Sequence, residues 1–168
     1  MERLNSLVAC ALLLICSCAC NPDKKLSEEA IRTQPEEAEP SVQDLRHRLL
    51  DKGYEVFEYV DEKSGDTVLM QQYFIAFLKS GPNRSQSKAE ADSLQRLHLA
   101  HLGKMYAEGF ADISGPFGDD GEIRGITIYN TPTLEMADSL ANMDPMVKAG
   151  RLVIEVHPWW AAKGFPLR

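Results

Sequence analysis

The chain has no cysteine after residue 20. Its four cysteines all lie close to the N-terminus, at Cys10, Cys16, Cys18 and Cys20. A disulfide framework would distribute cysteines through the folded part of the chain, and a zinc site would combine them with later ligands. We therefore assign the cysteines to an N-terminal leader, and we expect neither a disulfide framework nor a bound metal in the body of the protein.

The sequence also lacks an excess of basic residues and, after residue 20, a long apolar run. Its formal net charge of −7 argues against a nucleic-acid or anionic-surface partner held by general electrostatics. No segment beyond the leader is long and apolar enough to cross a bilayer. The hydrophobic content of 44% is enough to form a core, and 168 residues suit one domain with additional segments.

Residues 1–20, MERLNSLVACALLLICSCAC, are typical of a secretory signal peptide, because their apolar run is too short for a transmembrane helix. Small residues and cysteines follow the run and resemble the lipobox of bacterial lipoproteins. Cys18 fits that pattern best, since Ile15 lies three residues before it and Ser17 directly before it. The alternatives are lipidation at Cys20 and an ordinary cleaved signal. We expect a lipid anchor at Cys18 and a location at the bacterial cell envelope, on a periplasmic or surface face.

The rest of the chain divides into three parts. Residues 21–40 are acidic, polar and proline-containing, which predicts a disordered tether. Residues 41–66 are predicted to add a helix and a strand before the main domain at 67–168. The expected helices are 41–52, 87–108 and 132–143, with a short helical turn after Asp144–Pro145, and the expected strands are 54–60, 68–78, 110–117, 123–130 and 151–157.

From residue 68 onward the predicted order is strand, helix, strand, strand, helix, strand. This order is typical of a ferredoxin-like βαββαβ fold of the α+β class, with an antiparallel sheet covered by helices on one face. The other face of the sheet needs a cover, which a second subunit often supplies in small domains of this kind. The N-terminal helix and strand extend the fold.

Four motifs occur in order at compatible spacing: His101–Leu102 in a helix, Gly115–Pro116 after a strand, Asp144–Pro145 at the start of a DPxxxAG run, and Pro158–Trp159 after the last strand. Together they resemble the YciI-like (YCII-related) family over roughly residues 70–160. The resemblance implies a dimeric α/β barrel in which each subunit has a cleft. One branch of the family includes a dehydrochlorinase of a chlorinated hydroxyquinol.

The resemblance also implies a histidine and an aspartate as an acid/base pair, which map to His101 and Asp144. Asp119 or Asp120 could take the place of Asp144, and Asp119 is also a candidate ligand-binding residue. By helical spacing, His101 lies near the centre of a stripe formed by Leu94, Leu97 and Met105, where an imidazole needs hydrogen bonds. A structural histidine bonded to a backbone carbonyl is the alternative, and Asp144 has a second role available as a helix N-cap.

Two further residues are candidate ligand-binding groups. Arg124 is placed to enter the cleft and pair with a carboxylate or phenolate, although a surface position is the alternative. His98 lies three residues before His101, so the two could face one ligand. Two histidines without a third ligand are a poor zinc signature, and no metal is expected.

Two hypotheses for function follow. The first is an enzyme without a cofactor that performs lyase, isomerase or dehalogenase chemistry on a small organic acid through the His–Asp pair. The second is a non-catalytic dimeric ligand-binding or scaffold domain at the cell envelope. An enzyme should have His101 bonded to a carboxylate and open to a pocket, whereas a scaffold should have that histidine sealed in the core. A homodimer, a small-molecule ligand and membrane attachment through the lipid are the expected partners.

Overall fold

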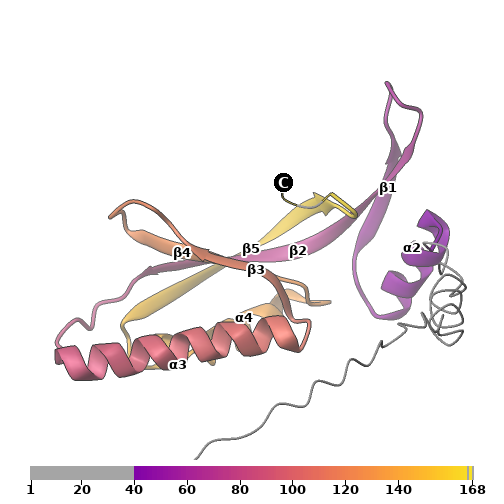
Figure 1. Cartoon of the computed structure of the whole chain (residues 1–168). Coiled ribbons are helices and arrows are strands. Elements are labelled where there is room, and N and C mark those ends of the chain that lie inside the picture. Colours follow the sequence, from indigo (N-terminus) through magenta and orange to yellow (C-terminus); the bar gives the residue numbers. More distant parts are fainter. Residues whose placement is uncertain (1–39, 166, 168) are drawn as a thin grey trace, which may run out of the picture. The chain divides into compact units, whose positions relative to one another are not determined.

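A computed structural model of the chain describes residues 40–165 and residue 167. The predictions for residues 1–39, including lipidation at Cys18, lie outside this part. Within the described residues, no helix has both the length and the apolar character needed to cross a bilayer. The elements are α2 (Val42–Asp51), β1 (Val56–Val60), β2 (Thr67–Ser80), α3 (Lys88–Ala107), β3 (Ala111–Pro116), β4 (Ile123–Tyr129), α4 (Leu134–Asn142), α5 (Pro145–Lys148) and β5 (Leu152–Ala162), as Figure 1 shows.

The strands form one antiparallel sheet in which β2 is central. β5 pairs with one edge of β2, and β4 and then β3 follow on the other edge. This order is the ferredoxin-like arrangement, so the predicted α+β fold class and the βαββαβ order are confirmed. β1 pairs with the first residues of β2 in the predicted hairpin, so β2 serves both the hairpin and the main sheet.

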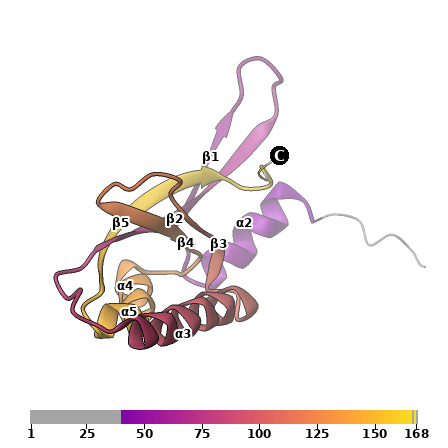
Figure 2. The same ribbon diagram turned by 60° about the vertical axis from the view of Figure 1, so that its left-hand side comes forward.

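Helices α3, α4 and α5 lie along one face of the sheet (Figures 1 and 2). Phe74 and Ala76 of β2 point toward them and pack with Met105 of α3 and Tyr129 of β4. A second cluster, Leu78, Met146 and Leu152, continues this layer toward the end of β2. These apolar contacts hold the helices on the sheet, and the second cluster forms the floor of the site described below.

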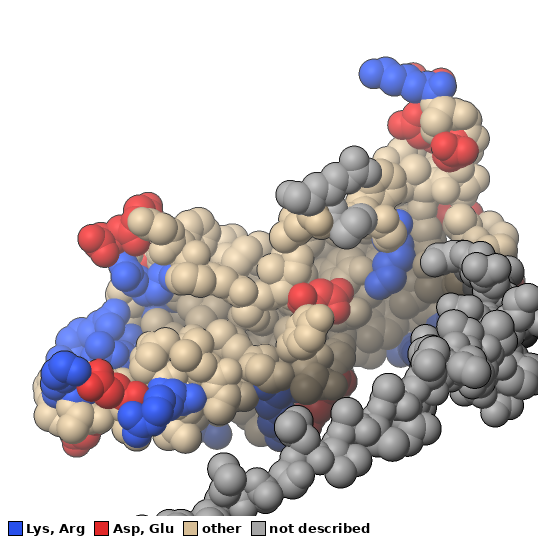
Figure 3. Space-filling model, in the orientation of Figure 1, with Lys and Arg blue, Asp and Glu red and all other residues tan. Residues whose placement is uncertain are grey.

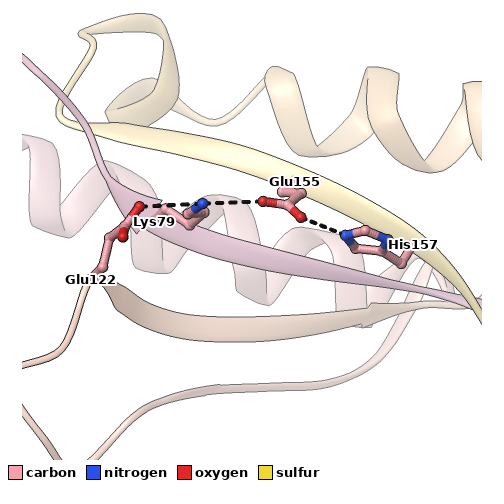
Figure 4. A network of polar contacts seen from close by, with 4 residues as sticks. All are labelled: Lys79, Glu122, Glu155 and His157. Atoms are coloured by element: carbon pink, nitrogen blue, oxygen red, sulfur yellow. Dashed lines mark hydrogen bonds and ion pairs between the residues drawn. The ribbon is translucent and has the colours of Figure 1, made fainter.

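The opposite face of the sheet is also largely apolar. Because side chains alternate along a strand, Ile75 and Phe77 point away from the helices, and their partners Ile126 and Ile128 on β4 lie on the same face. A polar network crosses this face beside Phe77 and Ile75, whose partners on β5 are Glu155 and His157 (Figure 4). In it, Lys79 contacts Glu122 and Glu155, each at 3.2 Å, and Glu155 lies 2.7 Å from His157.

The last strand is longer than the sequence analysis predicted. We expected it to end at residue 157, before Pro158, because proline cannot donate to a strand ladder. In the structure β5 continues to Ala162 and pairs with β2 as far as Met70. β5 lies at an edge of the sheet, where a proline can be accommodated because its missing N–H faces outward.

The helix starts are governed by local capping. Ser87 caps α3 in a capping box with Glu90, close to the predicted start. The helix expected over residues 132–143 begins later, at Leu134: Thr133 caps it and accepts from the Met136 N–H, and Thr131 is buried with its hydroxyl donating to the Thr133 carbonyl. Thr131 and Thr133 are both residue types that can cap a helix. Because Thr131 is buried, Thr133 is the one that caps α4.

Candidate active-site cleft

A cleft of about 410 Å³ opens between α3 and the ends of the central strands. Its apolar walls are formed by residues of α3, by the second core cluster and by the glycine-containing end of β3. Polar groups on the walls come from α3, β3, β4 and the loop before α3. The lining residues are Leu78, Arg84, Gln95, His98, Leu99, Leu102, Ser114, Gly115, Pro116, Arg124, Gly125, Ile126, Met146, Arg151 and Leu152.

The most chemically distinctive feature of this cleft is a buried histidine–carboxylate pair. His98 Nδ1 lies 2.5 Å from Asp144 Oδ2, and the two residues are 8% and 2% exposed. Asp144 also caps α5, because its Oδ1 accepts from the Met146 N–H at 2.8 Å. Both carboxylate oxygens are therefore engaged, and the pair is held rigidly between α3 and α5.

Asp144 remains a carboxylate in this environment. Burial alone would raise its pKa, but the hydrogen bond and charge of His98 and the Met146 N–H together lower the pKa of Asp144 below its ordinary value. The neighbouring Tyr129 has its pKa raised, first by burial and then by the negative charge of Asp144. An ionised Asp144 accepts a hydrogen bond from His98 Nδ1, so the second ring nitrogen, Nε2, is the one left for a ligand in the cleft.

The expectation that His101 pairs with Asp144 is wrong, since His98 makes that contact. His101 does not line the cleft. Among the residues that the structure describes, its Nε2 is buried without a partner, and the ring hydrogen-bonds to the backbone of Leu140. Burial lowers the pKa of His101, while the nearby Asp144 carboxylate acts in the opposite direction. His101 thus has the surroundings that the structural alternative described, a side chain held by a backbone carbonyl.

His98 rather than His101 contacts Asp144 because of the rotation of α3 about its axis and its position along that axis. Three residues along a helix correspond to about 4.5 Å along the axis, and this difference puts His98 opposite the N-cap of α5. The inward stripe of α3 runs through Leu94, His98 and Met105, whereas the predicted member Leu97 is 51% exposed. The candidate ligand-binding residue His98 therefore takes the position expected for His101.

The other predicted residues divide between the cleft and the surface. Arg124 lines the cleft as predicted, and its guanidinium donates to the Gly121 carbonyl at 3.1 Å. Asp119 is exposed in the turn between β3 and β4 and does not line the cleft. Asp120 is also exposed and approaches Arg124 at 3.8 Å. Neither aspartate can replace Asp144 as the partner of the histidine.

Two cleft residues, Arg84 and Arg151, were missed by the sequence analysis. Arg84 belongs to the loop before α3, and Arg151 directly precedes β5. Figure 3 shows that basic side chains gather at this end of the molecule, where α3 begins and β3 turns into β4, with acidic groups among them. Nothing in the spacing of these arginines along the chain indicates that they share a cleft, because hydrogen bonds between the loop and the residues before β5 bring them together.

Within residues 40–165 and 167, no group of three or more histidine, cysteine, aspartate or glutamate side chains could hold a metal ion. A hydrogen-bonded histidine–carboxylate pair with one free ring nitrogen can instead accept and return a proton. The fold and cleft together define a ferredoxin-like α+β domain with a buried histidine–carboxylate pair at the wall of a cleft.

Comparison with known proteins gives no family: no protein-family model matches the chain, and no curated protein matches it. Among solved structures, the chain is similar to 5-chloro-2-hydroxyhydroquinone dehydrochlorinase from Burkholderia phenoliruptrix AC1100, solved in complex with 2,5-dihydroxybenzoquinone. The sequence identity is 22%, the TM-score is 0.41, and the match covers 52% of this chain and 92% of that one. A likeness this distant carries no argument about the site, so the YciI-like resemblance stays a prediction.

Proposed function

We propose that this protein is an enzyme that performs acid/base chemistry without a cofactor on a small organic acid, with His98 as the proton-transfer group and Asp144 as the residue that orients it. The reaction class is that of a lyase, isomerase or dehalogenase. The proposal keeps the histidine–aspartate pair of the sequence analysis and replaces His101 with His98.

The buried contact between His98 and Asp144 at the wall of a cleft carries this proposal. An enzyme was expected to have a histidine that is bonded to a carboxylate and open to a pocket, and His98 satisfies both conditions. Removing a carboxylate and an imidazole from water is costly unless each is satisfied by the other and by further hydrogen bonds. A fold that needed only a helix cap at Asp144 would not need a histidine against it.

The proposed step is a single proton transfer. His98 Nε2 takes a proton from a carbon or hydroxyl of the bound acid, and the electron pair of the broken bond stays on the substrate. The resulting imidazolium is stabilised by the Asp144 carboxylate, as in other oriented imidazole bases. Return of the proton at another atom gives isomerisation. In an elimination, the electron pair of the broken C–H bond forms the new double bond, and a neighbouring group leaves with the electron pair of its own bond to carbon.

Deuterium exchange tests this proposal without knowledge of the net reaction. The full chain is incubated in D₂O with a panel of 2-oxo, 2-hydroxy and unsaturated carboxylic acids, and the substrate protons are followed by ¹H NMR. We expect at least one acid that binds the protein to lose a specific C–H signal faster than in buffer alone. Binding of several panel acids with no accelerated exchange in any of them would contradict the proposal.

A homodimer is the second part of the proposal, supported by the apolar sheet face that carries Ile75, Phe77, Ile126 and Ile128. Ile75, Phe77 and Ile126 are half-buried in the single chain, and a second copy placed on this face would cover what remains accessible of them. Light scattering on the protein in detergent, corrected for bound detergent, should give twice the mass that mass spectrometry finds for one chain. Phe77→Lys should reduce that mass to one chain, and a monomeric parent would remove the dimer.

A non-catalytic ligand-binding or scaffold domain remains the second candidate, and the same apolar face is the observation that favours it.

For the location we propose a YciI-like lipoprotein anchored at the bacterial envelope through Cys18. This part rests on the leader sequence alone. Mass spectrometry of the mature N-terminus should find an acylated cysteine, and an unmodified N-terminus would end the proposal.

A further inference from the structure

We propose that the cleft binds a small molecule with two acidic groups, a dicarboxylate or its close equivalent, with one group held by Arg84 and Arg151 and the other by Arg124. The inference deepens the proposed function, and rests on it for the claim that such a molecule is the substrate. The binding claim itself depends only on the arrangement of charges in the cleft.

The first observation is the charge of the cleft wall. Arg84, Arg124 and Arg151 line it, and among the described residues its lining contains no aspartate or glutamate, because the Asp144 carboxylate lies behind His98. The protein as a whole has a formal charge of −7, so a wall with three cations and no carboxylate runs against its composition. Concentrated charge of one sign in a cleft attracts a ligand of the opposite sign.

The second observation is that these cations are poorly compensated by the protein. Among the described residues, no carboxylate lies within 4.0 Å of the guanidinium of Arg84 or Arg151. Arg124 has Asp120 at 3.8 Å, but the Asp120 side chain is fully exposed, so solvent screens that pair. The three arginines therefore keep most of their capacity to bind an anion.

The third observation is the division of the arginines between two sides of β2. Leu78 of β2 lies between Gly125 of β4 and Ile154 of β5 in the sheet. Arg124 precedes the first of these partners, and Arg151 lies just before β5. Since neighbouring strands are about 4.8 Å apart, the backbones of β4 and β5 are separated by roughly 10 Å. Backbones this far apart leave room for two acidic groups, one beside each strand, which a short diacid can supply.

The β5 side of the cleft is built rigidly. The loop that carries Arg84 is tied to the start of β5 by Gly81 N–H to the Arg151 carbonyl, 2.9 Å, and Asn83 N–H to the Gly150 carbonyl, 3.0 Å. A Cβ on Gly81 would lie 2.3 Å from the Gly150 carbonyl oxygen, so only glycine permits this approach. The loop is thus fixed against the strand that follows Arg151.

Gln86 orients the second arginine on that side. Its Oε1 accepts from the Arg151 guanidinium at 3.1 Å, while its Nε2 is buried without a partner. A neutral amide holds the guanidinium without neutralising it, unlike a carboxylate in the same place. Arg151 is therefore positioned by the protein and keeps its charge for a ligand, as expected of a charge-assisted anion contact.

The test is calorimetric binding to the full chain in detergent, with succinate and maleate as diacids, propionate as the monoacid and inorganic phosphate as a single dianion. We expect the diacids to bind at least tenfold more tightly than propionate or phosphate. Arg124→Gln and Arg151→Gln should each weaken diacid binding about tenfold and leave propionate binding less affected. Arg96→Gln, on the exposed part of α3 and outside the cleft, is the matched control.

Equal binding of succinate, propionate and phosphate would overturn the inference. Parent-like diacid binding by the Arg124 and Arg151 variants, with circular dichroism showing that they are folded, would also overturn it. The proposed function fails separately. His98→Gln should retain diacid binding, because it removes no cation. Diacid binding without deuterium exchange would leave the inference standing and contradict the proposed function. Deuterium exchange of monoacids at the same rate as diacids would contradict the inference and leave the proposed function standing.

Discussion

Replacing His98 with glutamine should slow deuterium incorporation into a bound acid by about 10²–10⁴-fold, the usual contribution of a positioned general base. Glutamine is of similar size and can still donate to Asp144, so the cleft should keep its shape. It has no group that accepts a proton at neutral pH. The measurement is the rate of loss of the substrate C–H signal at saturating acid, compared with the parent protein.

His101→Gln is the matched control for that experiment. His101 is on the same helix and only three residues away, yet it does not line the cleft and is bonded to the backbone of Leu140. The account predicts that His101→Gln keeps the parent exchange rate within a few-fold. A large loss for His101→Gln with little loss for His98→Gln would return the catalytic role to the residue that the sequence analysis chose.

Replacing Asp144 with alanine should lower the free energy of unfolding by about 2–4 kcal/mol at neutral pH, which combines the cost of a buried donor left without its acceptor and the loss of a helix cap. The substitution leaves the His98 Nδ1–H without an acceptor and the N-cap of α5 empty. Urea unfolding measures the change, with an unaltered m-value showing that the midpoint shift reflects stability. Asp144→Asn is the milder control, because an amide oxygen can still cap α5.

The effect of Asp144→Ala should depend on pH in a defined direction. The pKa of Asp144 is lower in the folded protein than its ordinary value of 3.8, so the unfolded chain binds the proton more readily. The stabilisation by this carboxylate is therefore fully present above the unfolded pKa and is lost as the pH falls through the folded pKa. The difference between parent and variant should be constant above about pH 5 and shrink below pH 4. A difference that does not shrink at all below pH 4 would contradict an ionised Asp144.

The fold could be predicted from the sequence because its elements are marked by local signals. Ser87 and Glu90 form the capping box of α3, and Gly53 ends the first predicted helix with a φ of +82°. Alternation and turn residues predict the strands, and the order of elements then admits few topologies. The end of β5 was predicted wrongly because of Pro158. A proline ends a central strand but is tolerated in an edge strand, and the sequence does not show which kind of strand β5 is.

The site was only partly predictable, for a different reason. Helical periodicity places His98 and His101 on nearly the same face of α3, but the residue that meets Asp144 depends on the rotation of α3 and on the position of α5. Those quantities come from packing between elements distant in the chain. Arg84 and Arg151 are likewise brought together by the hydrogen bonds between a loop and the start of β5. The spacing of residues within one segment cannot predict such contacts between distant segments.

The central claim is that His98 presents an unprotonated Nε2 to the cleft while its Nδ1–H is bonded to Asp144. The most direct test is ¹⁵N NMR of the histidine rings at pH 8, where an ordinary imidazole is neutral. With four histidines in the chain, His98→Gln identifies the relevant signals. We predict the Nδ1-protonated tautomer for His98, converting to the ordinary mixture in Asp144→Ala. An Nε2-protonated His98 in the parent protein would contradict the account.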